Sequence, residues 1–439
     1  MRQRIGVEHL NAPITNQQLD LALEEAERTI EELSALPENW LSFSNEKLLL
    51  ASESLGFLLR QRVQIHKRGY PSRDNDYLQL IERQIEELKQ VYLSFYRLAP
   101  GLIHQQKDVE PSLYTWLMFQ DEFGNELNNL LCGVKYLEEL DTTTAMLIAT
   151  HSSLTSLDNV LAELIEGQAK STSLYFECLR LRQTLSVALI KHWNKSGCID
   201  SEIAFPVLAL QDVEDGVSWI NANAQGDQYL FERLITKGDR STWFRRNFGI
   251  DAKHISSPKI KTYAKLLELK EFMEFDIESP LAPVDFVLSG DCNLVPQVLD
   301  NLSKLEEHQA EIWLQALYVV YGSRLPIEPQ SFGVEYSQQD IHDLLSQWVA
   351  QDKHKQNLPS RLGNALSFET TLAAMQDPNI DFVFRKWLWR QLCIQSRAYI
   401  SWHMVMPVYQ QDWNFHNLKV TPSVSERFNL RSNNAVMGY

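Results

Sequence analysis

The sequence predicts an all-α protein in which an N-terminal helical bundle is followed by an α-solenoid and a helical C-terminal unit. Three observations lead to this prediction. Apolar residues recur at helical spacing along most of the chain. Only 17 Gly and 16 Pro occur among 439 residues, which leaves few of the tight turns that an all-β fold needs. Two Gly-Asp steps, with glycines at 226 and 290, are each followed by the same apolar rhythm.

The first hundred residues are predicted to form three amphipathic helices. The first begins near Asn16 and repeats leucine-type residues at steps of three and four. A second is expected over about 45–64, and a third follows a loop at 67–76. Three helices with short connections bury their apolar stripes only against one another, so we expect an up-and-down bundle over 1–105. Residues 99–111 are expected to form a linker.

A helical domain that leads into the solenoid is expected over 106–199. Its four helices are predicted at roughly 112–131, 136–150, 154–168 and 172–194. Gly197 suits the left-handed position that follows the last turn of a helix. The last of these helices is therefore expected to end near this glycine.

The Gly-Asp steps are interpreted as structural turns. At Gly226-Asp227 and Gly290-Asp291, the glycine can end one helix with a positive φ. The aspartate can then accept hydrogen bonds at the start of the next helix. The glycines are 64 residues apart, which equals two units of about 32 residues and is close to the period of helical solenoids. We therefore expect HEAT-like repeats over 200–325, with Gly-Asp turns in an ordinary bundle as the alternative.

A C-terminal helical unit is expected over 326–413, followed by a polar tail over 414–439. The tail lacks helical periodicity, so we expect it to be mobile or docked as an extended strip. The unit before it is rich in Trp, Tyr, Met and Arg, which are enriched at protein interfaces. Its candidate protein interface consists of Trp387, Trp389, Arg390, Trp402, Met404, Met406, Tyr409 and Trp413. The alternative is that most of these side chains close the end of the solenoid core.

The charge balance bears on the kind of partner. The chain has 57 acidic and 41 basic side chains, for a formal net charge of −16. This charge argues against a general nucleic-acid surface and favours a basic or polar protein partner. No uncharged apolar run approaches the roughly 18 residues that a membrane helix needs, and the first residues lack the apolar stretch of a signal peptide. A cytoplasmic protein without membrane insertion is expected.

No motif for catalysis or cofactor binding stands out. The P-loop, GxGxxG, GxSxG and HExxH patterns are all absent. No CxxC pair occurs, so neither a zinc cluster nor a disulfide framework is expected. Cys292 lies near a predicted helix start, but without a visible histidine partner a buried thiol is the preferred interpretation. The carboxylates at 212–215 are interpreted as a solvated helix edge. We predict no enzyme activity, cofactor or metal.

A Gly-Asp step, a Pro-containing helix and an Ala-rich helix that ends in Gly follow one another over 289–325. These features fall on Gly290, Asp291, Pro296, Ala316 and Gly322. With this pattern, the stretch resembles the uncharacterised HEAT-like proteins associated with bacterial type VI secretion.

The resemblance extends over roughly 135–413. Arg361, Gly363 and Arg385 match the closing unit of that family, and Pro407 and Gln410 match its terminal pattern. The acidic Pro-Trp-Pro segment of the family is absent here, and the first hundred residues have no counterpart.

The resemblance implies a non-enzymatic adaptor or chaperone-like scaffold that binds spike, effector or other components of a type VI secretion system. Two alternatives stay open: an immunity-type inhibitor of a toxin, and a toxin-related enzyme whose site is assembled from separated residues. One tight partner would mark the inhibitor. A deep polar pocket with several perturbed carboxylates or histidines would mark the enzyme.

Overall fold

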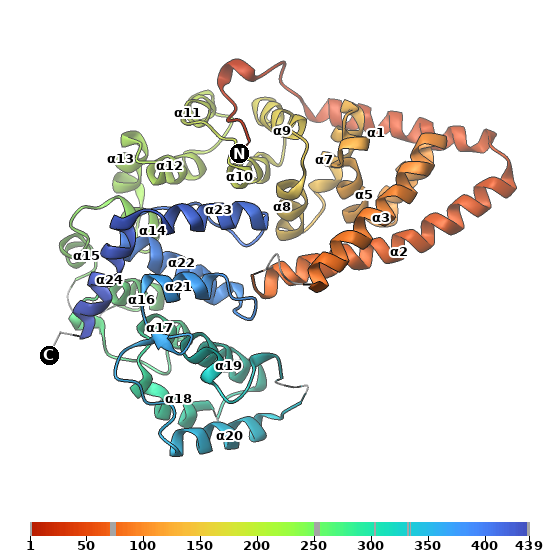
Figure 1. The fold of residues 1–439 in the computed structure, drawn as a ribbon. Coiled ribbons are helices and arrows are strands. Elements are labelled where there is room, and N and C mark those ends of the chain that lie inside the picture. The colour runs from red at the N-terminus through yellow and green to blue at the C-terminus, as the bar shows by residue number, and fades with distance from the viewer. Residues whose placement is uncertain are drawn as a thin grey trace. The chain divides into compact units, whose positions relative to one another are not determined.

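The computed structural model describes residues 2–70, 76–249, 255–302, 304–331, 333 and 335–436. Helices follow one another along almost all of this part of the chain (Figure 1). The only sheet among the described residues is a hairpin of two short strands, β1 (Ser360–Arg361) and β2 (Asn364–Ala365). The prediction of an all-α fold is therefore confirmed.

The chain forms two compact units, each assembled from three stretches of sequence. Unit 1 comprises Met1–His66, Arg73–Leu208 and His403–Gln411. Unit 2 comprises Lys67–Ser72, Ala209–Trp402 and Asp412–Tyr439. Helices predicted for 1–105 and for 106–199 thus belong to the same compact unit.

The helices of unit 1 are mostly short. They are η1 (Val7–His9), α1 (Asn16–Glu31), η2 (Glu32–Ala35), α2 (Glu38–Arg68, whose last two residues belong to unit 2), α3 (Asp76–Leu98), α4 (Pro100–His104), η3 (Gln105–Asp108), α5 (Pro111–Met118), α6 (Asp121–Gly124), α7 (Leu127–Leu137), α8 (Thr142–His151), α9 (Ser156–Glu166), α10 (Thr172–Arg182), α11 (Val187–Ser196) and α12 (Ser201–Leu210, whose last two residues belong to unit 2). The helices α1 and α2 begin directly after Thr15 and Pro37, residue types that start helices well.

The stretch 99–111 is not a linker, which corrects the prediction. It contains α4 and η3, and the side chains of Leu102 and Ile103 are fully buried. Pro100 occupies the first turn of α4, where a missing N–H costs least. Gly101 lies so close to α1 that a Cβ atom there would stand 2.1 Å from the carbonyl oxygen of Thr29. Tight packing against α1 therefore holds this stretch inside unit 1.

The helix predicted over 172–194 is interrupted, which is a second correction. Gln183 ends α10 in the left-handed conformation with a φ of 60°, and α11 begins four residues later. Just before the break, the buried side chain of Arg182 donates to the carboxylate of Asp158 from Nε at 2.5 Å and from Nη2 at 2.9 Å. The apolar periodicity of the sequence continues across the break, so it could not reveal the interruption.

Unit 2 contains the remaining helices. They are α13 (Glu214–Asn223), α14 (Leu230–Thr236), α15 (Arg240–Phe248), α16 (Pro258–Leu266), η5 (Lys270–Phe272), α17 (Ala282–Ser289), η6 (Cys292–Leu294), α18 (Val295–Leu302), α19 (Glu307–Tyr321), η7 (Gly322–Arg324), η8 (Pro329–Ser331), α20 (Gln338–Ala350), α21 (Phe368–Met375), α22 (Phe382–Ser396), α23 (Val408–Lys419, whose first four residues belong to unit 1) and α24 (Pro422–Val436).

The two Gly-Asp steps differ in detail. Gly290 ends α17 with a φ of 62°, and the carboxylate of Asp291 accepts from the backbone N–H of Asn293 at 2.9 Å. Gly226 also has a positive φ, of 52°, but it lies beyond the end of α13. The carboxylate of Asp227 pairs with Lys259 at 3.3 Å instead of capping α14. Only the second step therefore combines a helix end with a side-chain cap.

The C-terminal stretch is helical, which corrects the prediction of a mobile or extended tail. Residues 414–419 lie in α23 and residues 422–436 in α24. The side chains of Val424 and Phe428, one helical turn apart, are buried, and α24 packs against α21 and α22. Two apolar residues at a spacing of four are a weak signal in a polar sequence, but they suffice to hold a helix against a core.

Candidate functional site

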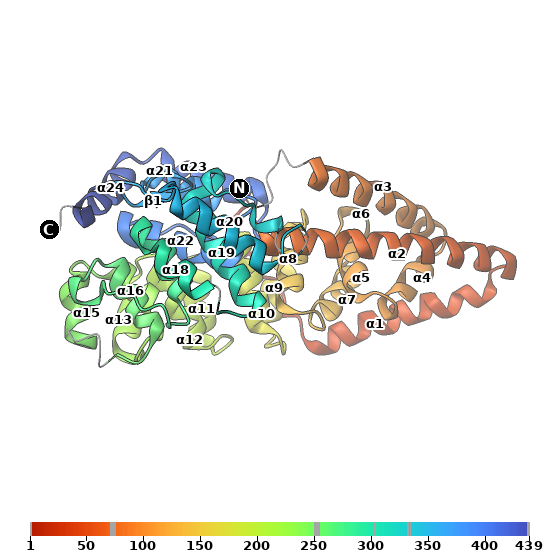
Figure 2. The same ribbon diagram turned by 90° about the horizontal axis from the view of Figure 1, so that it is seen from below.

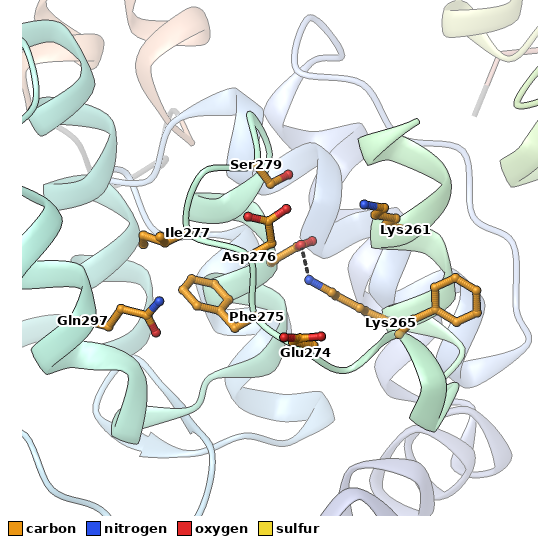
Figure 3. A pocket seen from close by; sticks show the side chains of 10 residues that line it. Lys261, Lys265, Glu274, Phe275, Asp276, Ile277, Ser279 and Gln297 are labelled. Atoms are coloured by element: carbon orange, nitrogen blue, oxygen red, sulfur yellow. Dashed lines mark hydrogen bonds and ion pairs between the residues drawn. The ribbon is translucent and has the colours of Figure 1, made fainter. Parts of the chain in front are cut away.

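A pocket of about 340 Å³ opens in unit 2 between α16 and α17 (Figure 3). It is lined by Lys261, Lys265, Phe272, Glu274, Phe275, Asp276, Ile277, Ser279, Asp285 and Gln297. The residues come from α16, from η5 and the loop that follows it, and from the starts of α17 and α18. Charged and aromatic side chains therefore meet in one concave place.

The local sequence explains how α16 contributes two lysines to the same wall. Pro258 occupies the first turn of the helix, and the hydroxyl of Ser257 accepts from a backbone N–H of that turn. Lys261 and Lys265 are four residues apart, so their side chains lie on one face of the helix. Figure 3 shows both lysines on one side of the pocket, while Phe275 lies on the other side, with Ile277 and Gln297 beyond it.

The carboxylate of Asp285 is the buried charge of the site, since only 4% of the residue is exposed. It accepts from the hydroxyl of Thr262 at 2.7 Å and from the ammonium of Lys265 at 2.5 Å. Burial raises the pKa of the Asp285 carboxyl above its ordinary value, although Lys265 and Thr262 act in the opposite direction. The result is a buried ion pair whose two members satisfy each other.

The mouth of the pocket carries a different charge balance. Glu274 and Asp276 are exposed, and one oxygen of Asp276 accepts from the backbone N–H of Glu278 at 3.2 Å, which orders the loop. Because Lys265 is paired with Asp285, the remaining charged side chains of the lining are the two carboxylates of Glu274 and Asp276 and the ammonium of Lys261. The rim is therefore net negative.

This arrangement is suited to binding a small cationic group. The two rim carboxylates would attract the cation, and the face of Phe275 would supply an apolar and cation–π contact. The ammonium of Lys265 already lies 6.0 Å from the centre of the Phe275 ring. Metal binding is a separate matter: within the described residues, no group of three or more His, Cys, Asp or Glu side chains is placed to hold a metal ion.

The eight residues predicted as an interface do not form one exposed surface. Trp387, Trp402, Met404 and Met406 are buried, and this corrects the expectation that they are presented to a partner. Trp389 and Arg390 are half-buried. Tyr409 and Trp413 are exposed, at 56% and 46%. Met404, Met406 and Tyr409 belong to unit 1 and the other five to unit 2.

The buried tryptophans are held by neighbours within unit 2. The ring of Trp387 packs against that of Tyr263 at 5.3 Å, and the guanidinium of Arg390 lies 4.6 Å from the Trp387 ring. The guanidinium of Arg385 lies 5.1 Å from the ring of Trp402. Composition alone cannot separate such core aromatics from interface aromatics, because both settings favour large rings beside arginine.

All five cysteines, Cys132, Cys178, Cys198, Cys292 and Cys393, are free and buried. Cys292 is 3% exposed, and burial raises the pKa of its thiol. A buried thiol with a raised pKa is a poor nucleophile. The structure thus places Cys292 where the sequence interpretation expected it.

Sequence reasoning missed the pocket. One local signal was available: two lysines at helical spacing, 261 and 265, precede a run of acidic and aromatic residues with one methionine, over 271–276. That run gives no periodicity for helix or strand. The run becomes part of a pocket only together with Asp285. The packing of α17 against α16 brings Asp285 to Lys265.

Comparisons of the chain with family models, curated proteins and solved structures found no match. Across the helices that the structure describes, none combines the length and the apolar character needed to cross a membrane.

Proposed function

We propose that the chain is a non-enzymatic adaptor or chaperone-like scaffold of a type VI secretion system, with HEAT-like repeats over 200–325. Two features support this proposal. The fold is all-α in the described part of the chain, as it is in the helical repeat proteins that bind other proteins. The resemblance of 135–413 to a secretion-associated family supplies the biological setting. The scaffold acts in the cytoplasm on spike, effector or other machine components.

The pocket between α16 and α17 carries the binding part of the proposal. Its net-negative rim of Glu274, Asp276 and Lys261 and its aromatic wall receive a lysine or arginine side chain of the partner protein. The buried pair of Asp285 and Lys265 holds α16 and α17 in place behind the rim. A partner with a basic contact residue also matches the net charge of −16.

A charge reversal at the rim tests this role. The double variant Glu274→Lys/Asp276→Lys alters two exposed side chains. It also removes the hydrogen bond from the backbone N–H of Glu278 to Asp276, so circular dichroism and thermal unfolding must first show that the fold persists. We expect it to lose retention of purified secretion components and to fail to restore secretion in a deletion strain. The matched control, Glu311→Lys/Asp343→Lys, changes the net charge equally at two exposed helical positions away from the pocket. It should behave like the unaltered chain.

Unimpaired secretion in the deletion strain, together with no retained component, would refute the adaptor role. Equal behaviour of the two double variants would refute the role of the pocket. Retention of one tightly bound toxin in a one-to-one complex would instead identify the immunity-type inhibitor.

A further inference from the structure

The pocket between α16 and α17 contains charges of both signs that do not pair with one another. Lys265 is satisfied by Asp285, at 2.5 Å behind the rim. Of the remaining lining residues, Lys261 is cationic, and Glu274 and Asp276 are anionic. In the described part of the chain, none of these three side chains forms an ion pair. One ammonium and two carboxylates are therefore left for a ligand.

Separate segments of unit 2 supply the two signs of charge. The helix α16 carries Lys261, the loop after η5 carries both carboxylates, and α18 carries Gln297. The helices α16 and α18 lie near each other in both views of the ribbon (Figure 1 and Figure 2). Figure 3 shows Lys261 on one side of the pocket and Phe275 on the opposite side, with Asp276 between them in that view. A ligand in the pocket therefore meets groups of both signs.

The size and the walls of the pocket suit a small molecule with an aliphatic part. Its volume of about 340 Å³ is near the lower end of the roughly 300 to 1,000 Å³ that ligand pockets span. A volume at this end of the range suits a molecule the size of an amino acid. Phe272 is buried, and Phe275 and Ile277 are half-buried. Methylene groups pack against such side chains while their charged ends stay at polar groups.

We propose that this pocket binds a free basic amino acid, lysine or arginine. At neutral pH such a molecule carries two cations, the α-ammonium and the side-chain group, and one carboxylate. The lining offers the complementary set, with Glu274 and Asp276 for the two cations and Lys261 for the carboxylate. The Cα atoms of Glu274 and Asp276 are two residues apart, hence separated by at most about 7 Å. The carbon chain between the two nitrogens of a lysine molecule can span this separation and lie against Phe275.

The charge pattern favours this ligand over simpler ones. A diamine would leave the ammonium of Lys261 without a counter-charge, and a neutral amino acid would leave one rim carboxylate without one. A charge that loses water on binding and gains no partner lowers the affinity. The pocket therefore selects a molecule that carries all three charges. This ligand goes beyond the proposed adaptor role, because its binding needs no partner protein.

Occupancy by a free amino acid also has a consequence for the proposed adaptor. The same rim carboxylates receive the basic side chain of the partner protein, so the amino acid and the partner exclude each other. This consequence rests on the proposed function, whereas the binding of the amino acid does not. The titrations below use the purified chain alone, so their failure leaves the adaptor role standing, and failure of the adaptor role leaves the titrations standing.

Isothermal titration calorimetry of the full chain tests the ligand directly. L-lysine and L-arginine are expected to bind with a dissociation constant on the order of 0.1 mM. Three analogues each lack one charge of lysine: cadaverine lacks the carboxylate, 6-aminohexanoate the α-ammonium, and norleucine the side-chain ammonium. Each should bind at least about tenfold more weakly than lysine. No binding of either amino acid up to about 10 mM, or equal affinity for lysine and cadaverine, overturns the proposal.

Removing the ammonium of Lys261 tests where the carboxylate of the ligand binds. In Lys261→Met, lysine should lose its roughly tenfold advantage over cadaverine, while the affinity for cadaverine does not fall. Lys195→Met is the control, because it removes the same charge from an exposed position of α11 that does not line the pocket. It should keep the full advantage. A Lys261→Met variant that weakens both ligands equally, or that still prefers lysine, contradicts the assignment.

Neutralising the rim carboxylates tests where the two cations bind. Glu274→Gln/Asp276→Asn keeps the shapes of both side chains, and the amide oxygen at 276 can still accept from the backbone N–H of Glu278. With circular dichroism unchanged, lysine should bind about a hundredfold more weakly. The matched control Glu311→Gln/Asp343→Asn removes two exposed charges away from the pocket and should bind like the unaltered chain. Unaltered lysine binding by Glu274→Gln/Asp276→Asn overturns the proposal.

Discussion

Two buried arginines, Arg182 in unit 1 and Arg361 in unit 2, have opposite environments. In unit 1, Arg182 pairs with Asp158 and also donates to the carbonyl oxygens of Ala149, Ser152 and Leu154. In unit 2, Arg361 is fully buried without a carboxylate partner in the described chain. It donates only from Nη2, to the carbonyl of Val287 at 3.0 Å and the amide oxygen of Gln391 at 3.2 Å. Its Nε and Nη1 have no hydrogen-bond partner among the described residues.

This difference shows that burial alone does not determine how much an arginine contributes to the stability of the fold. Asp158 and the carbonyl oxygens compensate the desolvation of Arg182, because every donor of its guanidinium has an acceptor. Burial without such compensation lowers the pKa of Arg361 to about 9. The contribution of each arginine to the stability of its unit should therefore differ, and substitutions can measure that difference.

The largest effect is expected from Asp158→Ala, which breaks the compensated pair. The substitution leaves the guanidinium of Arg182 buried without a counter-charge, and we expect a loss of about 3 to 5 kcal/mol in the free energy of unfolding. Urea denaturation followed by circular dichroism measures this loss. A change below about 1 kcal/mol would show that solvent reaches Arg182 in unit 1.

A second large effect concerns the pH dependence of unit 1. Burial lowers the pKa of His104 to about 4, and burial also lowers the pKa of His151 well below its ordinary value of 6.5. As the pH falls below 6.5, the unfolded chain gains protons at these positions and the folded chain does not. The stability of unit 1 should therefore decrease by about 1.4 kcal/mol per pH unit for each histidine, down to pH 4 for His104.

Denaturation midpoints between pH 7.5 and 4.5 test this prediction. His104→Gln removes one titrating group and should make the pH dependence shallower, even though its stability at pH 7.5 is lower than that of the unaltered chain. An unchanged slope would contradict the assignment of His104 as a neutral buried residue.

A smaller effect is expected from Arg361→Met in unit 2. The substitution removes two hydrogen bonds and leaves the carbonyl of Val287 without this donor, but it also removes a buried charge that has no counter-charge. We expect a loss of about 1 to 2 kcal/mol, clearly less than that caused by Asp158→Ala. Equal losses for the two variants would mean that Arg361 is compensated as fully as Arg182.

The smallest changes in stability are expected from replacing the aspartates of the two Gly-Asp steps in unit 2. Asp291→Ala removes a side-chain cap and should cost about 0.5 to 2 kcal/mol. Asp227→Ala removes only a partly exposed ion pair with Lys259, so a smaller change is expected. Thermal unfolding of the two variants side by side measures the difference. A larger loss for Asp227→Ala would show that capping is not what distinguishes the two turns.

Local patterns determined much of the secondary structure. The periodicity of leucine-type residues predicted α1 and α3, and the positive φ of Gly290 followed from a glycine between two apolar runs. Such features depend on neighbours within one or two helical turns, so the sequence contains them directly. The prediction that Cys292 is a buried thiol rested on similar local reasoning.

Only the tertiary structure decided which faces are buried and which charges meet. Trp387 and Trp413 look alike in the sequence, yet one lies in the core and the other is exposed. The pair of Asp285 and Lys265 depends on how α17 packs against α16, and the pair of Asp158 and Arg182 closes across 24 positions of the chain. Side-chain periodicity specifies that a helix has an apolar face. It does not specify the partner of that face, because many partners of similar shape and polarity are compatible with the same pattern.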